Sequence, residues 1–117
     1  MTQFSTAIPL NELPNKVPQA RIVDGVPIAI VRIDDEVFAV SDRCTHADIA
    51  LSEGEVEGCS LECWLHGSAF DLRTGKPSSP PAIEPVAVYA TRISGTNQDV
   101  LVEVDVTSPI NTESRLS

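Results

Sequence analysis

The sequence predicts an all-β protein, an antiparallel β-sandwich made of many short strands. Short runs rich in Val, Ile and Ala alternate with turns rich in Gly, Pro, Asp and Asn along the 117 residues. This alternation is typical of sandwiches and barrels. We find no amphipathic helix and no internal repeat. With 42% hydrophobic residues, a chain of this length forms one domain around a real core.

The expected strands can be followed along the chain from the amino terminus. They are Gln3–Ile8, Val17–Val23, Ile28–Ile33, Val37–Val40, Glu55–Val56, Ser60–Glu62, Ala69–Leu72, Val86–Ile93 and Val100–Val104. Turn-forming residues separate them, with Pro9 ending the first strand and further turns expected at Asn11–Asn15, Asp24–Gly25, Asp34–Glu36 and Arg73–Lys76. The polar residues from Thr107 to Ser117 are expected to fray.

Two short motifs carry the candidate metal ligands. Cys44-x-His46 and Cys63-x-x-His66 each offer one thiolate and one imidazole, and sixteen residues, 47–62, separate them. They use both histidines of the chain and two of its three cysteines. Cys-x-His followed by Cys-x-x-His is the ligand pattern of a Rieske centre, a [2Fe–2S] cluster with two cysteines on one iron and two histidines on the other. We therefore predict that these four residues bind one such cluster per chain.

Two other interpretations of these motifs remain open. Zinc sites usually pair their ligands as Cys-x₂₋₄-Cys and His-x₃₋₅-His, whereas Cys44 and His46 are closer together and differ in type. The alternative without any metal would require both histidines to fall beside cysteines by chance.

The third cysteine, Cys59, is interpreted as a small core side chain, with a redox-active thiol as the alternative.

The charge and the hydropathy of the chain limit the classes of partner that it can bind and the cellular locations that it can occupy. A net charge of −9, from 17 acidic against 8 basic residues, argues against binding a nucleic acid and favours docking to a basic protein surface. The residues Met1–Leu10 lack the basic and apolar regions of a signal peptide. The longest apolar run, Val26–Val31, is far shorter than the roughly 20 residues of a membrane span. We expect a cytoplasmic protein that does not enter a membrane.

The sequence resembles the small Rieske-type ferredoxins, which include the ferredoxin components of bacterial aromatic-ring dioxygenase systems. The resemblance extends from Ala20 to Val104 and is strongest between Arg43 and Lys76, where CWLHGSAFDLRTGK resembles the second ligand loop and its following hairpin. It implies a Rieske-type β-sandwich with a small cluster-binding subdomain of two ligand loops. We expect a single Rieske domain over 1–106, its cluster-binding part at about 43–82, and a polar tail over 107–117.

Three more residues are expected near the cluster. Trp64, the only tryptophan, lies between two ligands and is expected to shield the cluster, with packing on the loop as the alternative. The resemblance implies that the Ser68 hydroxyl donates to a cluster sulfide and that Pro81 belongs to a loop covering the cluster. It also implies that both histidines bind iron through Nδ1.

Departures from the respiratory Rieske proteins predict a low reduction potential. Those proteins carry a disulfide between the two ligand loops, but Ile49 and Leu65 stand at the corresponding positions here. They also carry a tyrosine hydroxyl where this chain has Phe70. Because hydrogen bonds to sulfur raise the potential, we predict a value on the order of −150 mV, at the low end of the Rieske range.

These features predict an electron carrier and not a catalyst of substrate chemistry. The four protein ligands saturate the irons, and no histidine remains for the mononuclear iron of an oxygenase subunit. The resemblance implies a monomer that docks transiently with a flavin-dependent ferredoxin reductase and a terminal oxygenase. Two alternatives remain open, namely the small subunit of a nitrite-reductase-like enzyme and a ferredoxin associated with iron–sulfur cluster assembly. The acidic stretch Asp48–Glu62 is either a docking face or a solvated loop.

Overall fold

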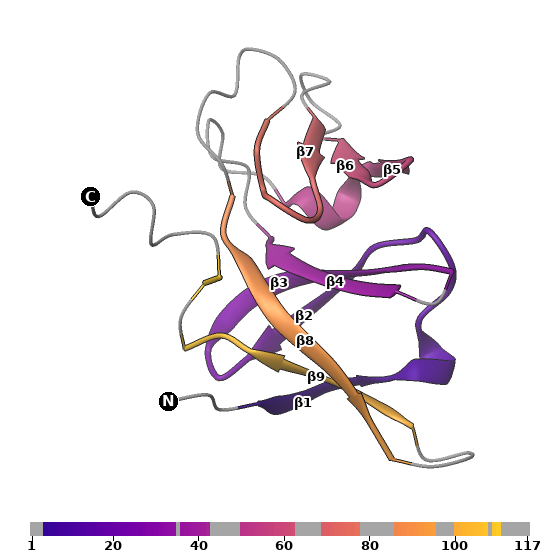
Figure 1. The fold of residues 1–117 in the computed structure, drawn as a ribbon, viewed down its shortest axis with the longest axis vertical. Helices are drawn as coiled ribbons and strands as arrows, with labels where there is room; N and C mark the ends of the chain where they lie inside the picture. Colours follow the sequence, from indigo (N-terminus) through magenta and orange to yellow (C-terminus); the bar gives the residue numbers. More distant parts are fainter. Residues whose placement is uncertain are drawn as a thin grey trace.

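The computed structural model describes residues 4–34, 36–42, 50–62, 69–77, 86–95, 100–107 and 109–110 (Figure 1). Within these ranges the chain forms strands and two 3₁₀ helices of three residues each. The elements are β1 (Ser5–Pro9), η1 (Leu10–Glu12), β2 (Gln19–Val23), β3 (Val26–Ile33), β4 (Glu36–Ser41), η2 (Leu51–Glu53), β5 (Glu55–Glu57), β6 (Ser60–Glu62), β7 (Ala69–Asp71), β8 (Val88–Ser94) and β9 (Leu101–Asp105). The all-β prediction is confirmed, and every expected strand is present.

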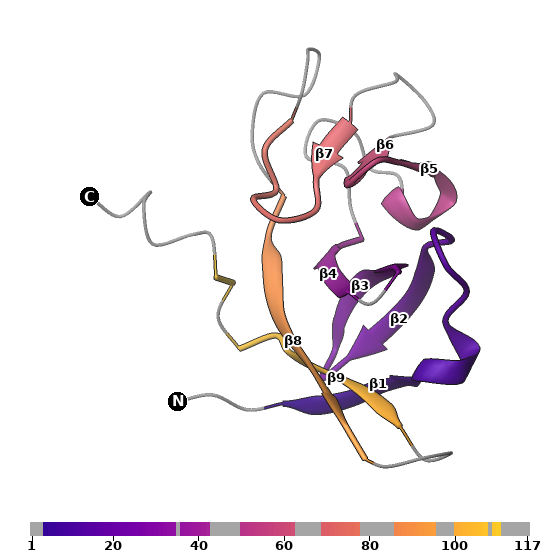
Figure 2. The same cartoon turned by 45° about the vertical axis from the view of Figure 1, so that its right-hand side comes forward.

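Six strands form the larger sheet, in the order β1-β9-β8-β4-β3-β2, with antiparallel pairing throughout. The sheet folds back on itself, so that its two edge strands approach each other (Figure 2). The Ser5 hydroxyl on β1 donates a hydrogen bond of 2.7 Å to the Asp24 carboxylate beside β2. The two halves of this sheet enclose a hydrophobic core, which is the predicted sandwich.

A smaller sheet, in the order β5-β6-β7, lies at one end of the larger sheet (Figure 1). A second hydrophobic core joins the two sheets, and β3 contributes to both cores because its faces alternate. Ile28 and Ile30 pack into the core of the sandwich, whereas Ala29 and Val31 pack toward the smaller sheet. All four are fully buried. The continuous apolar run of β3 therefore reflects a strand that is covered on both faces.

Two hairpins form at the predicted turns. Val23 pairs with Val26, and the two residues between them, Asp24 and Gly25, have φ angles of 50° and 82°. Positive φ at both central positions is the geometry of the type I′ turn, which matches the twist of antiparallel strands. β3 and β4 are likewise joined by two residues, since their last paired residues are Ile33 and Glu36.

Several strand ends differ from the predicted ones where the chain enters or leaves a turn. Leu72 was expected to extend β7, and its N–H donates to the Cys59 carbonyl at 2.9 Å in register with the β6–β7 pairs. The strand nevertheless ends at Asp71, whose carbonyl accepts from the Gly75 N–H at 2.7 Å and so begins the turn. Val86 was expected to start β8, but its N–H bonds to the Gly75 carbonyl at 2.9 Å. The predicted strands were one residue too long at the end of β7 and two residues too long at the start of β8.

The amino-terminal and carboxy-terminal segments show two further corrections. Pro9 was expected to end the first strand, yet it pairs with Leu101 on the edge strand β1, where a missing N–H is tolerated. The fraying expected from Thr107 onward is wrong for two of its residues. The Thr107 N–H bonds to the Asp105 carboxylate at 2.9 Å, and the Ile110 N–H bonds to the Val88 carbonyl at 2.8 Å. Among the described elements, no helix is long and apolar enough to cross a membrane.

Candidate metal centre

The predicted ligands fall in two segments, residues 43–49 and 63–68, that lie outside the described residues. Cys44 and His46 lie in the first segment, and Cys63, Trp64, His66 and Ser68 lie in the second. Pro81 lies in residues 78–85, which are also outside the described residues. Their roles therefore stay predictions. The structure does describe the residues on both sides of each segment, and these stems determine where the two predicted ligand loops begin and end.

The second ligand loop connects two paired strands. β6 and β7 are antiparallel, and Glu62 pairs with Ala69 immediately before and after residues 63–68. One position further from the loop, Leu61 pairs with Phe70, and both side chains are almost completely buried. This pair anchors the hairpin to the core between the sheets, because an apolar cross-strand pair and its burial both stabilise the sheet.

The first ligand loop also has two fixed ends. On its amino-terminal side, the Ser41 N–H donates to the Ala87 carbonyl at 2.9 Å. On its carboxy-terminal side, η2 is anchored by Leu51, which is fully buried. The Asp42 carboxylate joins these two ends, since it accepts hydrogen bonds from the Ser52 N–H at 2.6 Å and the Ser52 hydroxyl at 2.8 Å.

Gly54 brings the stems of the two loops together. A Cβ at this position would lie 1.7 Å from the backbone oxygen of Glu62, so no other residue fits without movement of the backbone. Gly54 follows η2 at the end of the first loop, and Glu62 precedes the second loop. The two loops therefore start from adjacent stems at one end of the molecule (Figure 1).

The donor set fits a Rieske cluster. Two segments with adjacent stems each carry one cysteine and one histidine, which is the number and kind of side chains that the two irons require. Within the part of the chain that the structure describes, no group of three or more His, Cys, Asp or Glu side chains could hold a metal ion.

Cys59 lies beside this region, in the turn between β5 and β6. It packs against the core between the sheets, as expected for a small apolar side chain. Its Sγ also accepts a hydrogen bond of 3.0 Å from Arg73, whose guanidinium binds Glu36 at 3.1 Å. Burial raises the pKa of the Cys59 thiol, while the positive charge of Arg73 opposes this shift. The thiol is therefore less acidic than that of a free cysteine.

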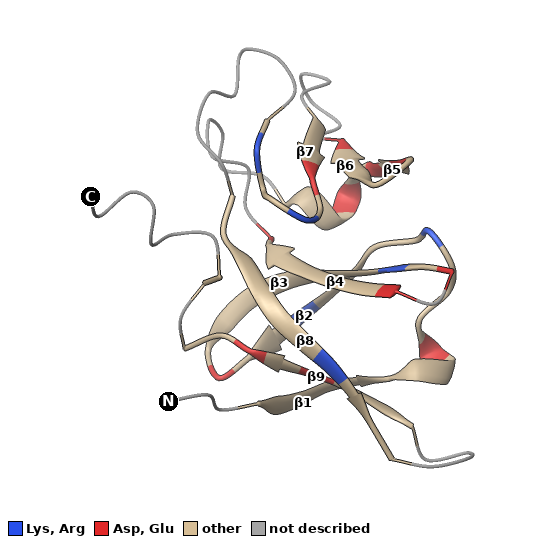
Figure 3. Ribbon diagram, viewed as in Figure 1, with Lys and Arg blue, Asp and Glu red and all other residues tan. Residues whose placement is uncertain are grey.

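Acidic residues gather along η2 and the strands of the smaller sheet (Figure 3). Glu53, Glu55 and Glu57 are exposed, and Glu62 is partly buried. No lysine or arginine occurs between Asp48 and Glu62, so this stretch carries uncompensated negative charge. The surface next to the stems of the candidate metal centre is therefore acidic.

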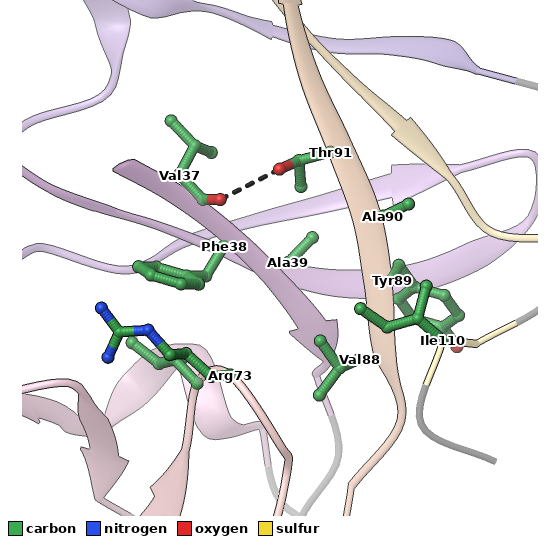
Figure 4. A pocket seen from close by; sticks show the side chains of 10 residues that line it. Val37, Phe38, Ala39, Arg73, Val88, Tyr89, Ala90, Thr91 and Ile110 are labelled. Carbon is green, nitrogen blue, oxygen red and sulfur yellow. Dashed lines mark hydrogen bonds between the residues drawn. The ribbon is translucent and has the colours of Figure 1, made fainter. Parts of the chain in front are cut away.

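A pocket of about 350 Å³ opens where β4 and β8 separate (Figure 4). Their pairing covers only Ala39 with Tyr89 and Val40 with Val88, and beyond it the Thr91 hydroxyl donates to the Val37 carbonyl at 3.0 Å. Among the described residues, the lining of this pocket is mostly apolar and contains no cysteine or histidine.

Sequence reasoning missed Asp42, Ser52 and Gly54 as residues that organise the stems. Asp42 and Ser52 are ten positions apart, and no local pattern indicates that their side chains meet. No role in organising the stems was predicted for Gly54, which directly precedes the expected strand Glu55–Val56. Its position at the edge of an expected strand was the available signal, because glycine in extended segments often marks a close approach of another backbone.

Comparison with known proteins agrees with this arrangement. The Rieske [2Fe-2S] domain family matches residues 3–90. The anthranilate 1,2-dioxygenase ferredoxin subunit of Burkholderia cepacia is 45% identical over 97 residues, which are 83% of this chain and 86% of that protein. The ferredoxin of carbazole 1,9a-dioxygenase from Nocardioides aromaticivorans IC177 superimposes with a TM-score of 0.78 at 35% identity, over 86% of this chain and 97% of that one.

A further solved structure, the complex of reduced oxygenase and oxidized ferredoxin in carbazole 1,9a-dioxygenase, contains a chain with a TM-score of 0.74 and 28% identity. The match covers 90% of this chain and 94% of that chain. The family match spans most of the sequence, and both stems of the candidate metal centre lie inside it. The chain therefore belongs to the Rieske [2Fe-2S] domain family, and its cofactor is a Rieske-type [2Fe-2S] cluster.

Proposed function

We propose that this chain is the ferredoxin component of an aromatic-ring dioxygenase system and carries single electrons to its terminal oxygenase. The observation that carries the proposal is that both histidines of the chain fall in the two loops with adjacent stems. No imidazole is left for a second iron site, so the chain contains the electron-transfer part of such a system without its oxygenase chemistry.

In this proposal, Cys44 and Cys63 bind one iron and His46 and His66 bind the other. The cluster supplies one-electron oxidation and reduction when it is bound. Two neutral imidazoles in place of two thiolates make the cluster easier to reduce than an all-cysteine centre. Around it, Trp64 excludes water, the Ser68 hydroxyl donates to a sulfide, and Pro81 covers the cluster.

The proposal also includes the location and partners of the chain. A monomer in the cytoplasm receives electrons from a flavin-dependent reductase and then docks with the oxygenase. The similarity to a dioxygenase ferredoxin subunit and to the ferredoxin in a solved oxygenase–ferredoxin complex supports the docking with an oxygenase. The acidic surface over Glu53, Glu55 and Glu57 supports docking to a basic patch, since opposite charges accelerate encounter. Residues 1–106 form the single domain that carries these functions.

A reconstituted electron-transfer chain tests this function. The purified protein is combined with an NADH-dependent flavoprotein reductase and the terminal oxygenase of an aromatic-ring dioxygenase. We expect oxidation of the aromatic substrate only when all three proteins are present, and the His66→Ala variant should fail to support it. Cys59→Ser serves as the matched control and should support normal turnover. Isolation of the chain as a tightly bound subunit of a sirohaem enzyme, with no transfer to the oxygenase, would contradict the proposal.

A further inference from the structure

Asp42 is held at the start of the first predicted ligand loop by contacts in two directions. Its backbone N–H donates to the Pro27 carbonyl on β3 at 3.2 Å, which fixes the residue to the larger sheet. Its carboxylate reaches across to η2, where Oδ1 accepts from the Ser52 N–H at 2.6 Å and Oδ2 accepts from the Ser52 hydroxyl at 2.8 Å. One side chain thereby joins the residues before and after the loop.

The helix that receives this contact has no cap of its own. Ala50 precedes η2 and offers no side-chain hydrogen bond, although the first N–H groups of any helix need acceptors. Asp42 supplies the acceptor from the far side of the loop. Buried Leu51 fixes the same helix to the core. The Asp42–Ser52 bonds therefore join the two ends of the nine-residue segment 43–51 at anchored positions. A loop closed in this way has fewer conformations available to its side chains.

We propose that Asp42 is a positioning residue for the first ligand loop, and that its carboxylate bonds to Ser52 hold Cys44 and His46 ready for the cluster. This inference rests on the proposed function, because it takes those two residues as ligands. Groups that orient metal ligands from outside the coordination sphere strongly affect how tightly the metal is held. The expected result of removing Asp42 is faster loss of the cluster.

Substitutions at Asp42 and Ser52 test the proposal on the cluster-loaded protein. Iron release to a chelator should be about 10-fold to 100-fold faster in Asp42→Ala than in the parent protein. Asp42→Asn should restore slow release, because its amide oxygen accepts from the Ser52 N–H and its amide nitrogen donates to the Ser52 hydroxyl oxygen. Ser52→Ala keeps one of the two bonds, and its rate of iron release should lie between the rates of the parent protein and Asp42→Ala. The EPR signal of the reduced cluster should broaden in Asp42→Ala and sharpen again in Asp42→Asn.

Asp105 provides the matched control. Its Oδ1 accepts from the Thr107 N–H at 2.9 Å and from the Thr107 hydroxyl, so this carboxylate also binds the N–H and the hydroxyl of one residue, here at the end of β9. Asp105→Ala should lower the unfolding temperature and leave the rate of iron release and the EPR line shape unchanged. If Asp105→Ala releases iron as fast as Asp42→Ala, the effect is general destabilisation and the proposal is wrong.

The remaining outcomes separate this inference from the proposed function. If Asp42→Ala and Asp42→Asn lose iron equally fast, the charge and not the geometry matters, and the positioning role is wrong. If Asp42→Ala fails to fold, Ser52→Ala decides, since unchanged iron release in that variant overturns the proposal. A parent protein without iron and sulfide would instead overturn the proposed function. A loaded parent protein with unaffected variants would overturn the role of Asp42 alone.

Discussion

The Arg73 guanidinium connects the two sheets at the scale of single side chains. It donates to Cys59 Sγ on the smaller sheet and binds Glu36 on the larger one, and it lies over the Phe38 ring at 5.5 Å. Both charged partners of the Arg73–Glu36 pair are more than half exposed, so the pair itself adds little stability. The contact with Cys59 acts directly on the thiol, because Arg73 donates a hydrogen bond of 3.0 Å to its sulfur.

Cys59→Ser should leave the cluster intact. Cys59 packs on the core and bonds to Arg73, so its replacement removes no ligand. Iron and acid-labile sulfide per chain should equal those of the parent protein. Because burial raises the thiol pKa, alkylation of Cys59 in the loaded protein should show a midpoint above the pH of about 8.5 typical of a free cysteine. Loss of the cluster in Cys59→Ser would show that this thiol is a ligand.

Tyr89 should make the stability of the fold sensitive to alkaline pH. Burial raises the pKa of its phenol above the usual value of about 10, because the buried site disfavours the phenolate. A group whose folded pKa is raised contributes stability that is complete below the unfolded pKa and is lost as the pH rises through the folded pKa. Urea unfolding should therefore show stability falling above about pH 10, and less steeply in Tyr89→Phe. Identical pH profiles for the two proteins would contradict this account.

At the scale of elements, the arrangement of η2, β5 and β6 depends on a close contact between two backbone segments. Gly54 places the end of the first loop against Glu62 at the start of the second, with no space for a side chain. Gly58, in the turn of the same β5–β6 hairpin, is a different case. It has a φ of 59° but open space around it. The two glycines therefore separate the effect of crowding from the effect of backbone conformation.

Gly54→Ala should destabilise the fold more than Gly58→Ala. The Cβ at position 54 would overlap a backbone oxygen, and the expected cost is at least about 3 kcal/mol, the upper part of the range for overpacked sites. Gly58→Ala should cost about 1–2 kcal/mol, since only a left-handed conformation must be held. Urea unfolding of both variants measures the difference. Equal costs would show that the two stems are not in tight contact.

The strands could be predicted from sequence because their signals are local. The Asp24–Gly25 turn and the alternating apolar residues beside it each act within a few positions. The start of β8 could not be predicted, because the Val86 N–H bonds to the Gly75 carbonyl, which belongs to no strand. The Asp42–Ser52 contact could not be predicted either, because its two residues are ten positions apart. The predicted ligands depend on spacing alone, so the sequence indicates them although they lie outside the described residues.

The charge of the whole molecule should govern how fast it meets its partners. The net charge is −9, and Glu53, Glu55 and Glu57 lie exposed next to the loop stems. Electrostatic steering of this kind weakens as salt screens the charges. The rate of electron transfer from the reductase should therefore fall several-fold with rising ionic strength, and the triple change of these glutamates to glutamine should reduce the salt dependence.

Glu12→Gln is the control for this prediction. Glu12 is exposed on η1, which directly follows β1, and β1 lies on the side of the larger sheet away from the smaller one (Figure 1). Its replacement removes one charge without changing the acidic surface near the stems. The loss of rate is compared per charge removed. If this loss is the same in Glu12→Gln as in the triple variant, net charge alone determines the rate and this surface is not the docking face.

Metal analysis combined with an EPR redox titration of the purified protein is the decisive measurement for a low-potential Rieske cluster bound by two loops with adjacent stems. We expect two irons and two acid-labile sulfides per chain and a Rieske-type EPR signal on reduction. We also expect a midpoint potential on the order of −150 mV. A colourless protein with one zinc would contradict the cluster assignment, and a clearly positive midpoint would contradict the low-potential assignment.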